Sequence, residues 1–162
     1  MAQQTFENQQ PKTQETRTQE MKTFFRDLFG GTAPKRHGFR INPGGGPADL
    51  NILTHGSLEA RAQMGRRMFL FEQECAQILQ DDRVPMPQVW SGTDVFAAAF
   101  GCPVHRPSEG APFALPLVQT ASAADKLAEP DIFSGSLGEV FELADRLVEL
   151  CGSEHPLRIC DI

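Results

Sequence analysis

The longest stretch of helical periodicity in this chain runs from Ser57 to about Gln80. Its apolar side chains recur at steps of three and four, so they fall on one face of a helix. These side chains are Met64, Met68, Phe71, Cys75 and Ile78. Ser57 is a favoured N-cap residue. The pattern predicts a helix over residues 57–80, and a Met-rich face of this kind is typical of core packing.

A second amphipathic pattern covers residues 136–151. Ser136 and Glu139 have the spacing of a capping box, and Gly152 ends the pattern. The apolar stripe comprises Leu137, Val140, Phe141, Ala144, Leu147, Val148 and Cys151. The spacing predicts a packed helix whose stripe faces a sheet.

Shorter helices are predicted over residues 21–30, 95–100 and 122–127. Thr93 or Asp94 is placed to cap the second of these, and Gly101 stops it. A proline-rich segment separates the second from the third.

Three short strands complete the pattern: residues 39–41, the latter half of 84–90, and residues 157–162. Two prolines keep the first half of 84–90 out of a regular ladder. The run Asn42–Pro47 breaks the chain after the first strand. Strand, crossover helix and strand in succession indicate an α/β fold with a parallel sheet. Because the last strand then needs a further neighbour, we expect a truncated chain.

Composition agrees with a globular protein, with 40% apolar and 22% charged residues. No apolar run is long enough to span a bilayer, and the Gln- and Thr-rich residues 1–20 lack the apolar core of a signal peptide. We expect residues 1–20 to be disordered, the location to be cytoplasmic, and the four cysteines to be reduced thiols.

Charge is unevenly distributed. Residues 1–56 carry seven Lys and Arg against five Asp and Glu, and residues 57–162 carry eight against sixteen. The acidic larger part argues against a nucleic-acid-binding protein, which would present a basic face. Lys35, Arg36 and Arg40 form a small basic cluster, which fits either an anionic ligand or a solvated loop.

Four segments, in order, resemble the family of uroporphyrinogen decarboxylases and its corrinoid and coenzyme M methyltransferase relatives. They are Asp82–Pro85, Val95–Val104, Ala111–Val118 and Ala124–Asp131. The family has a strand, a short helix ending in Phe-Gly or Leu-Gly, a Pro-Phe or Pro-Leu segment, a charged hinge, a long helix and an inner strand. The resemblance covers residues 57–162.

The resemblance implies that residues 21–162 are the N-terminal portion of a (β/α)₈ TIM-type barrel, cut off after its first few strands. Active sites of such barrels lie at the carboxyl ends of the strands. Residues 90–94 and Asp161 are then close to the site. The implied activity is that of a carboxy-lyase of porphyrin biosynthesis. It uses no cofactor or metal, and the chain alone is expected to be inactive.

In this family a carboxylate stabilises the protonated pyrrole, and arginines hold the substrate carboxylates. The family's aspartate belongs to a Ser-Asp pair nine residues before the helix-ending glycine. Here Ser91 matches the serine, Gly92 stands in the aspartate position, and Asp94 is displaced by two. Asp94 is either the replacement carboxylate or a plain N-cap.

Other candidate site residues follow from the same resemblance. Trp90 and Ser91 are substrate-binding candidates because they follow a strand. Arg40 is the one arginine where the decarboxylases have an Arg-Gln-Ala-Gly-Arg motif, and that departure favours a diverged relative. Asp161 is either a catalytic residue at the barrel mouth or a residue of the turn that follows the strand.

Two other functions stay open at this point. A methyltransferase on the same barrel would act on a corrinoid protein or small thiol and would bind zinc through residues later in the fold. Cys102 and His105 supply two possible ligands, and a zinc site needs at least three. The other alternative is a small non-catalytic interaction module. The expected partner is a tetrapyrrole-like or methylated small molecule, with no nucleic acid or membrane, and the full-length parent is a possible homodimer.

Overall fold

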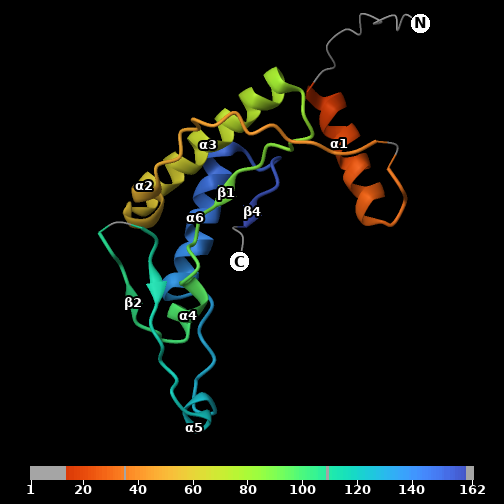
Figure 1. Cartoon of the computed structure of the whole chain (residues 1–162). Coiled ribbons are helices and arrows are strands. Elements are labelled where there is room, and N and C mark those ends of the chain that lie inside the picture. Colours follow the sequence, from red (N-terminus) through yellow and green to blue (C-terminus); the bar gives the residue numbers. More distant parts are fainter. Residues whose placement is uncertain (1–13, 35, 109, 160–162) are drawn as a thin grey trace, which may run out of the picture. The chain divides into compact units, whose positions relative to one another are not determined.

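The computed structural model describes residues 14–34, 36–108 and 110–159 (Figure 1). These residues divide into two compact units. Unit 1 comprises residues 1–42 and 75–84, and unit 2 comprises residues 43–74 and 85–162. The structure is mixed helix and sheet. Within the described ranges it has two two-stranded sheets and no closed barrel, and no helix is long and apolar enough to cross a membrane.

Unit 1 begins with helix α1, Gln14–Phe29. The helix predicted over residues 21–30 is present and starts earlier, so the predicted disorder is wrong for residues 14–20, while residues 1–13 lie outside the described part. Arg17 explains the longer helix, because its guanidinium donates to the carbonyl oxygens of Ala76 at 2.6 Å and Asp81 at 3.0 Å. This anchor ties the first turn of α1 to the C-terminal end of α3 (Leu58–Leu79).

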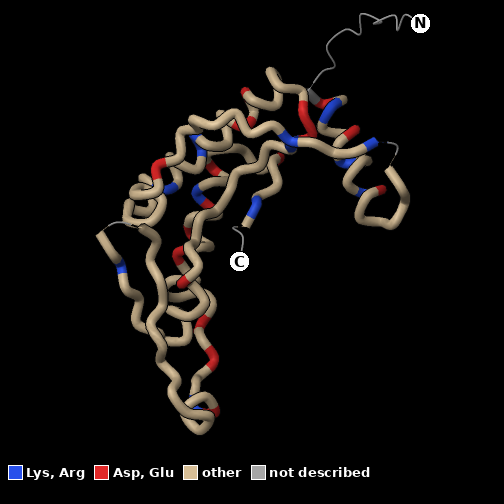
Figure 2. The backbone as a smooth tube through the Cα atoms, viewed as in Figure 1, with Lys and Arg blue, Asp and Glu red and all other residues tan. Residues whose placement is uncertain are grey.

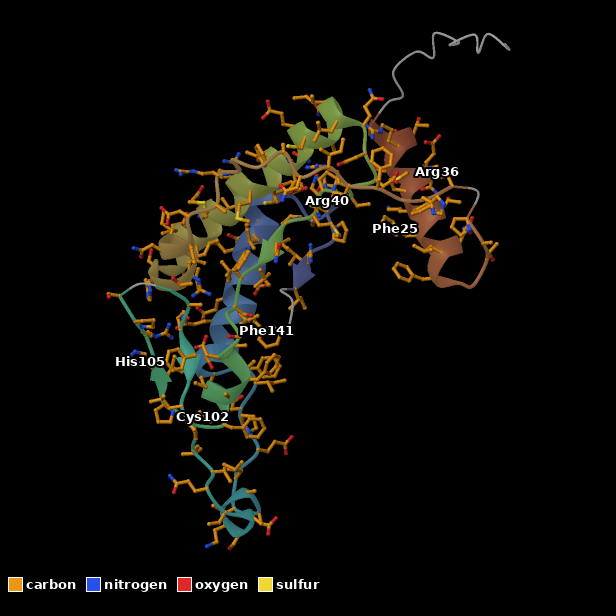
Figure 3. The ribbon with its side chains drawn as sticks, viewed as in Figure 1. Phe25, Arg36, Arg40, Cys102, His105 and Phe141 are labelled. Carbon is orange, nitrogen blue, oxygen red and sulfur yellow. The ribbon has the colours of Figure 1, made fainter. Side chains whose placement is uncertain are left out.

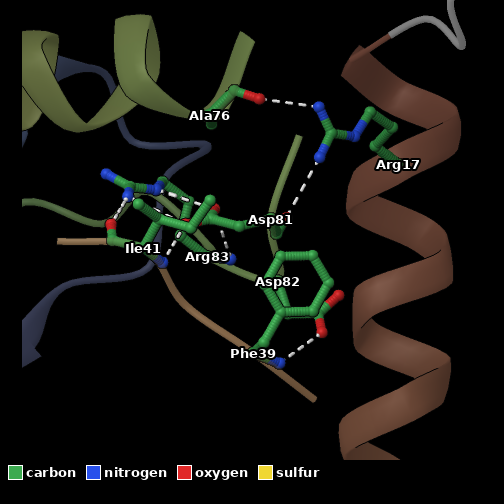
Figure 4. A network of polar contacts seen from close by, with 7 residues as sticks. All are labelled: Arg17, Phe39, Ile41, Ala76, Asp81, Asp82 and Arg83. Carbon is green, nitrogen blue, oxygen red and sulfur yellow. Dashed lines mark hydrogen bonds and ion pairs between the residues drawn. The ribbon is translucent and has the colours of Figure 1, made fainter. Parts of the chain in front are cut away.

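Two consecutive aspartates organise the rest of unit 1 (Figure 4). The Asp81 carboxylate is fully buried and accepts from Arg83 Nε at 2.8 Å and from the Ile41 amide at 2.8 Å. The Asp82 carboxylate accepts from Arg36 Nη1 at 2.6 Å and from the Phe39 amide at 2.8 Å. Each buried carboxylate is therefore matched to one guanidinium and to backbone amides, one for Asp82 and two for Asp81, which also accepts from the Arg83 amide at 3.2 Å.

These contacts lower the pKa of both carboxyl groups. The hydrogen bond from Arg83 is the main cause for Asp81, whose pKa falls to about 2. The hydrogen bond from Arg36 is the main cause for Asp82. Arg36 also lies over the ring of Phe24 at 4.8 Å, and Figure 3 labels it beside α1.

The strand predicted at residues 39–41 is wrong. Its backbone groups bind the side chains of Asp81, Asp82 and Arg83 and the Asp82 amide in place of a neighbouring strand. Extended backbone without a partner strand is a loop, and here carboxylates take the donors that a sheet would use.

The framework of unit 2 is a parallel strand pair joined through a helix. Strand β1, Gln88–Val89, pairs in parallel with β4, Arg158–Ile159, in the register Gln88 to Arg158 and Val89 to Ile159. Helix α6, Gly135–Cys151, lies between them in the sequence and packs against β1. The predicted parallel pair with a crossover helix is confirmed, and residues 160–162 of the last predicted strand lie outside the described residues.

The core of unit 2 lies where α3, β1 and α6 meet. It contains Ala62 from α3, Val89 from β1, and Leu143 and Leu147 from α6. Gly65 permits this approach, since a Cβ there would come within 2.9 Å of the Leu147 side chain. The long predicted helices are thus confirmed, but Phe141 is 45% exposed and Ile78 is 69% exposed. Those two side chains lie off the packed faces.

The predicted capping box of α6 is wrong. The N-cap is Ser134, and its side chain makes no capping bond. Ser136 Oγ instead donates to the Val95 carbonyl oxygen at 3.0 Å, and Glu139 pairs with Arg61. Both side chains therefore make tertiary contacts and do not cap the helix. Figure 2 shows the acidic residues of α6 in red.

The remaining elements of unit 2 are short. Helix α2 is Leu50–His55, α4 is Val95–Ala99, and α5 is Ala121–Ala124. The proline-rich segment contains an unpredicted antiparallel hairpin of β2, Val104–His105, and β3, Phe113–Ala114. The hairpin matters because its connection carries Arg106 over the end of β1.

Candidate functional site

The candidate site is a cavity of about 150 Å³ in unit 2, at the carboxyl end of β1. The loop that joins β1 to α4 forms one wall, and α2, α3, the hairpin connection and the start of α6 form the others. Its lining includes Arg61, Trp90, Ser91, Asp94, Arg106 and Glu139. Three of the predicted site residues, Trp90, Ser91 and Asp94, are therefore brought together.

Asp94 occupies the N-cap position of α4 without acting as a cap. Its backbone angles are already helical, φ −87° and ψ −12°, and its side chain makes no capping hydrogen bond. The carboxylate is only 7% exposed, and Arg106 Nη2 lies 4.0 Å from its Oδ2. The plain N-cap interpretation of Asp94 is therefore wrong, and its carboxylate belongs to the cavity.

Gly92 shapes the loop that carries Asp94. Its φ is +80°, a region that L side chains rarely adopt, and a Cβ there would come within 2.6 Å of Asp94 Oδ1. A side chain at position 92 would occupy the space that the Asp94 carboxylate uses. Glycine at position 92 and a carboxylate at position 94 are therefore compatible in this loop.

Arg61 holds the other side of the cavity. Its Nη2 donates to the Trp90 carbonyl oxygen at 3.0 Å, and its Nη1 lies 3.3 Å from Glu139 Oε2. Helices α3 and α6 are thereby tied to the residue that follows β1. The Nε of Arg61 and the indole Nε1 of Trp90 are both buried without a hydrogen-bond partner.

The other sequence candidates are not part of this cavity. Arg40 belongs to unit 1 and is exposed, and Asp161 lies outside the described residues. Cys102 and His105 flank the start of the hairpin (Figure 3), where the His105 ring packs against Phe113 at 5.0 Å. Among the described residues there is no group of three or more metal-ligating side chains.

Sequence reasoning missed Arg61, Arg106 and Glu139. Arg61 could have been noticed from the sequence, because it lies three residues before Met64 and therefore shares the packed face of the helix. Glu139 was assigned to the capping box. Arg106 carried no signal, because the hairpin that places it was not predicted.

Comparisons with known proteins gave no match: no family model, no curated protein and no solved structure resembles this chain significantly.

Replacing Gly92 by alanine is expected to lower the free energy of unfolding by about 1–3 kcal/mol, because of the positive φ and the displaced Asp94 carboxylate. Urea unfolding followed by the fluorescence of Trp90, the one tryptophan in the chain, measures the loss. Gly45→Ala is the control, since Gly45 has φ +64° and nothing within 4 Å. An equal loss in both variants would mean that Asp94 does not press on position 92.

Proposed function

We propose that unit 2 supplies the β1 side of a carboxy-lyase site of the uroporphyrinogen-decarboxylase-like type, with Asp94 as its acidic residue. In this proposal β1 and β4 are neighbouring strands of a (β/α)₈ barrel. Sites of such barrels lie at the carboxyl ends of the strands, which is where the cavity lies.

The single observation that carries the proposal is the state of the Asp94 carboxylate. It is buried in the cavity and is not used to cap α4. Loss of carbon dioxide from a pyrrole acetate requires protonation of the ring carbon, after which the cationic ring accepts the electrons of the breaking bond. A fixed carboxylate in a partly desolvated cavity stabilises that cation.

Arg106 has the complementary role of binding a substrate carboxylate at the cavity mouth. Its side chain is 56% exposed, and its distance to Asp94 is too long for a direct hydrogen bond. The guanidinium is therefore free to turn toward an incoming carboxylate, for which its planar fork is well shaped. A cavity of 150 Å³ admits one arm of a tetrapyrrole and not the whole ring system.

The test is carbon dioxide release from uroporphyrinogen by the natural gene product under anaerobic conditions. Asp94→Asn is expected to lower kcat about 10²–10³-fold, the usual effect of removing one preorganised electrostatic group. Asp145→Asn makes the same chemical change at an exposed position of α6 and serves as the control. No release by the gene product, or unchanged kcat in Asp94→Asn, contradicts the proposal.

A further inference from the structure

Two exposed phenylalanine rings lie against each other beside the first turns of α6, outside the cavity. Phe133 is 75% exposed and Phe141 is 45% exposed, and their ring centroids are 5.5 Å apart. The adjacent Ile132 is 48% exposed. Leu143 and Leu147 pack into the core from the same helix, so these rings lie off its buried face. Apolar side chains gathered on the surface of a soluble protein mark an interaction site.

The backbone holds Phe133 in place for such an interaction. The Asp131 carboxylate accepts from the Phe133 amide at 3.0 Å. The Phe133 carbonyl oxygen approaches α6 at Gly138, where a Cβ would come within 2.7 Å of it. The ring is therefore fixed against Phe141 before any partner arrives, and binding loses less conformational entropy.

The border of these apolar side chains is negatively charged. Asp131 and Glu142 are both exposed and directly precede or follow them in the sequence. Residues 125–145 contain one Lys and six Asp or Glu. Arg146 is the one basic residue of α6, and it is paired with glutamates at positions 59 and 149. A cation from outside is therefore the complement of this border.

We propose that Asp131, Ile132, Phe133, Phe141 and Glu142, here called the α6 patch, bind a basic amphipathic helix of a partner protein. Apolar side chains of that helix cover the rings, and its Lys and Arg side chains pair with the carboxylates or lie over an exposed ring face. Helix and loop side chains make up the patch, so an added strand would find no sheet edge there.

The charge of the α6 patch also separates this occupant from others. A second copy that used the same patch would bring like charges together, which opposes association. Nucleic acid and an anionic membrane surface are repelled for the same reason. The proposal does not depend on the activity proposed for the cavity, since Phe133, Phe141 and Glu142 are not among the residues that line it.

The test uses the full ¹⁵N-labelled chain and three model peptides. The first is acetyl-(Leu-Lys-Lys-Leu)₃-amide, the second has Glu in place of Lys, and the third has Ala in place of Leu. The first is expected to shift the amide signals of Phe133 and Phe141 saturably, and the other two to bind at least about tenfold more weakly. Equal affinity for the Lys and Glu peptides, or for the Leu and Ala peptides, overturns the proposed partner.

Two variants then locate the binding. Phe133→Ala is expected to weaken binding of the first peptide roughly 5- to 30-fold, and its control is Phe113→Ala, another exposed ring in an aromatic contact. Glu142→Lys is expected to weaken binding about tenfold, and its control is Glu74→Lys, the same charge change at an exposed position of α3.

Equal effects of a variant and its control would mean that the peptide binds through general charge or apolar attraction, and the α6 patch is then not the site. Sedimentation of the full chain tests the other occupant. Concentration-dependent association that Phe133→Ala abolishes would assign the patch to a second copy and overturn the proposed partner.

Discussion

Replacing Leu147 by alanine is expected to lower the free energy of unfolding of unit 2 by about 2–5 kcal/mol. Leu147 is fully buried on α6 and belongs to the cluster with Ala62, Val89 and Leu143. The cluster joins the crossover helix α6 to β1. The empty space left by the shorter side chain therefore weakens the framework that carries the candidate site. Urea unfolding followed by Trp90 fluorescence measures the change, because Trp90 directly follows β1.

Phe141→Ala is the matched control on the same helix. Because Phe141 is nearly half exposed and contacts the exposed ring of Phe133 at 5.5 Å, we expect a loss of about 1 kcal/mol. The sequence pattern alone assigns Phe141 to the packed stripe and would give it about 3–5 kcal/mol. A larger loss for Phe141 than for Leu147 would therefore mean that α6 packs through the face predicted from the sequence.

The sequence predicted those parts of the fold that depend on local periodicity. The long helices at residues 58–79 and 135–151 follow from apolar spacing, and the parallel pairing of β1 with β4 follows from a strand on each side of a crossover helix. Periodicity locates a helical face only to within about one residue position. This explains why Leu143, absent from the predicted stripe, is buried while Phe141 is exposed.

Features that depend on partners distant in the sequence were not predicted. Residues 39–41 have the composition of a strand, but their donors bind the carboxylates of Asp81 and Asp82, about forty residues away. Ser136 and Glu139 have capping-box spacing, but they bind Val95 and Arg61. Local propensity was overruled in both cases by tertiary hydrogen bonds.

The candidate site likewise contains some residues that the sequence predicted and others that it did not. Trp90, Ser91 and Asp94 were predicted because they follow a strand, and that position alone puts them at one edge of the sheet. Arg61, Glu139 and Arg106 come from three other elements, and only the fold brings them to that edge. The pairing of Arg61 with Glu139 and the position of Arg106 beside Asp94 could therefore not be predicted from the sequence.

Replacing Asp81 by asparagine is expected to destabilise unit 1 by about 3–5 kcal/mol, because it removes the buried carboxylate that pairs with the buried guanidinium of Arg83. Hydrogen exchange locates the effect. The Ile41 amide donates to Asp81 and the Phe39 amide to Asp82, so exchange is expected to rise most at Ile41. Asp27→Asn is the control, since its pair with Arg26 is exposed and is worth at most about 1 kcal/mol.

The same network predicts how the stability of unit 1 depends on pH. The pKa of Asp81 is lowered from 3.8 to about 2, mainly by the Arg83 hydrogen bond, so folding favours the ionised form. The stabilisation is complete above about pH 4 and is lost as the pH falls through 2, because the carboxylate is then protonated in the folded state too. Amide exchange at Ile41 should therefore rise between pH 4 and 2, after correction for the intrinsic rate. Asp81→Asn should flatten that dependence, and an unchanged pH profile in this variant would show that Asp81 is not the group responsible.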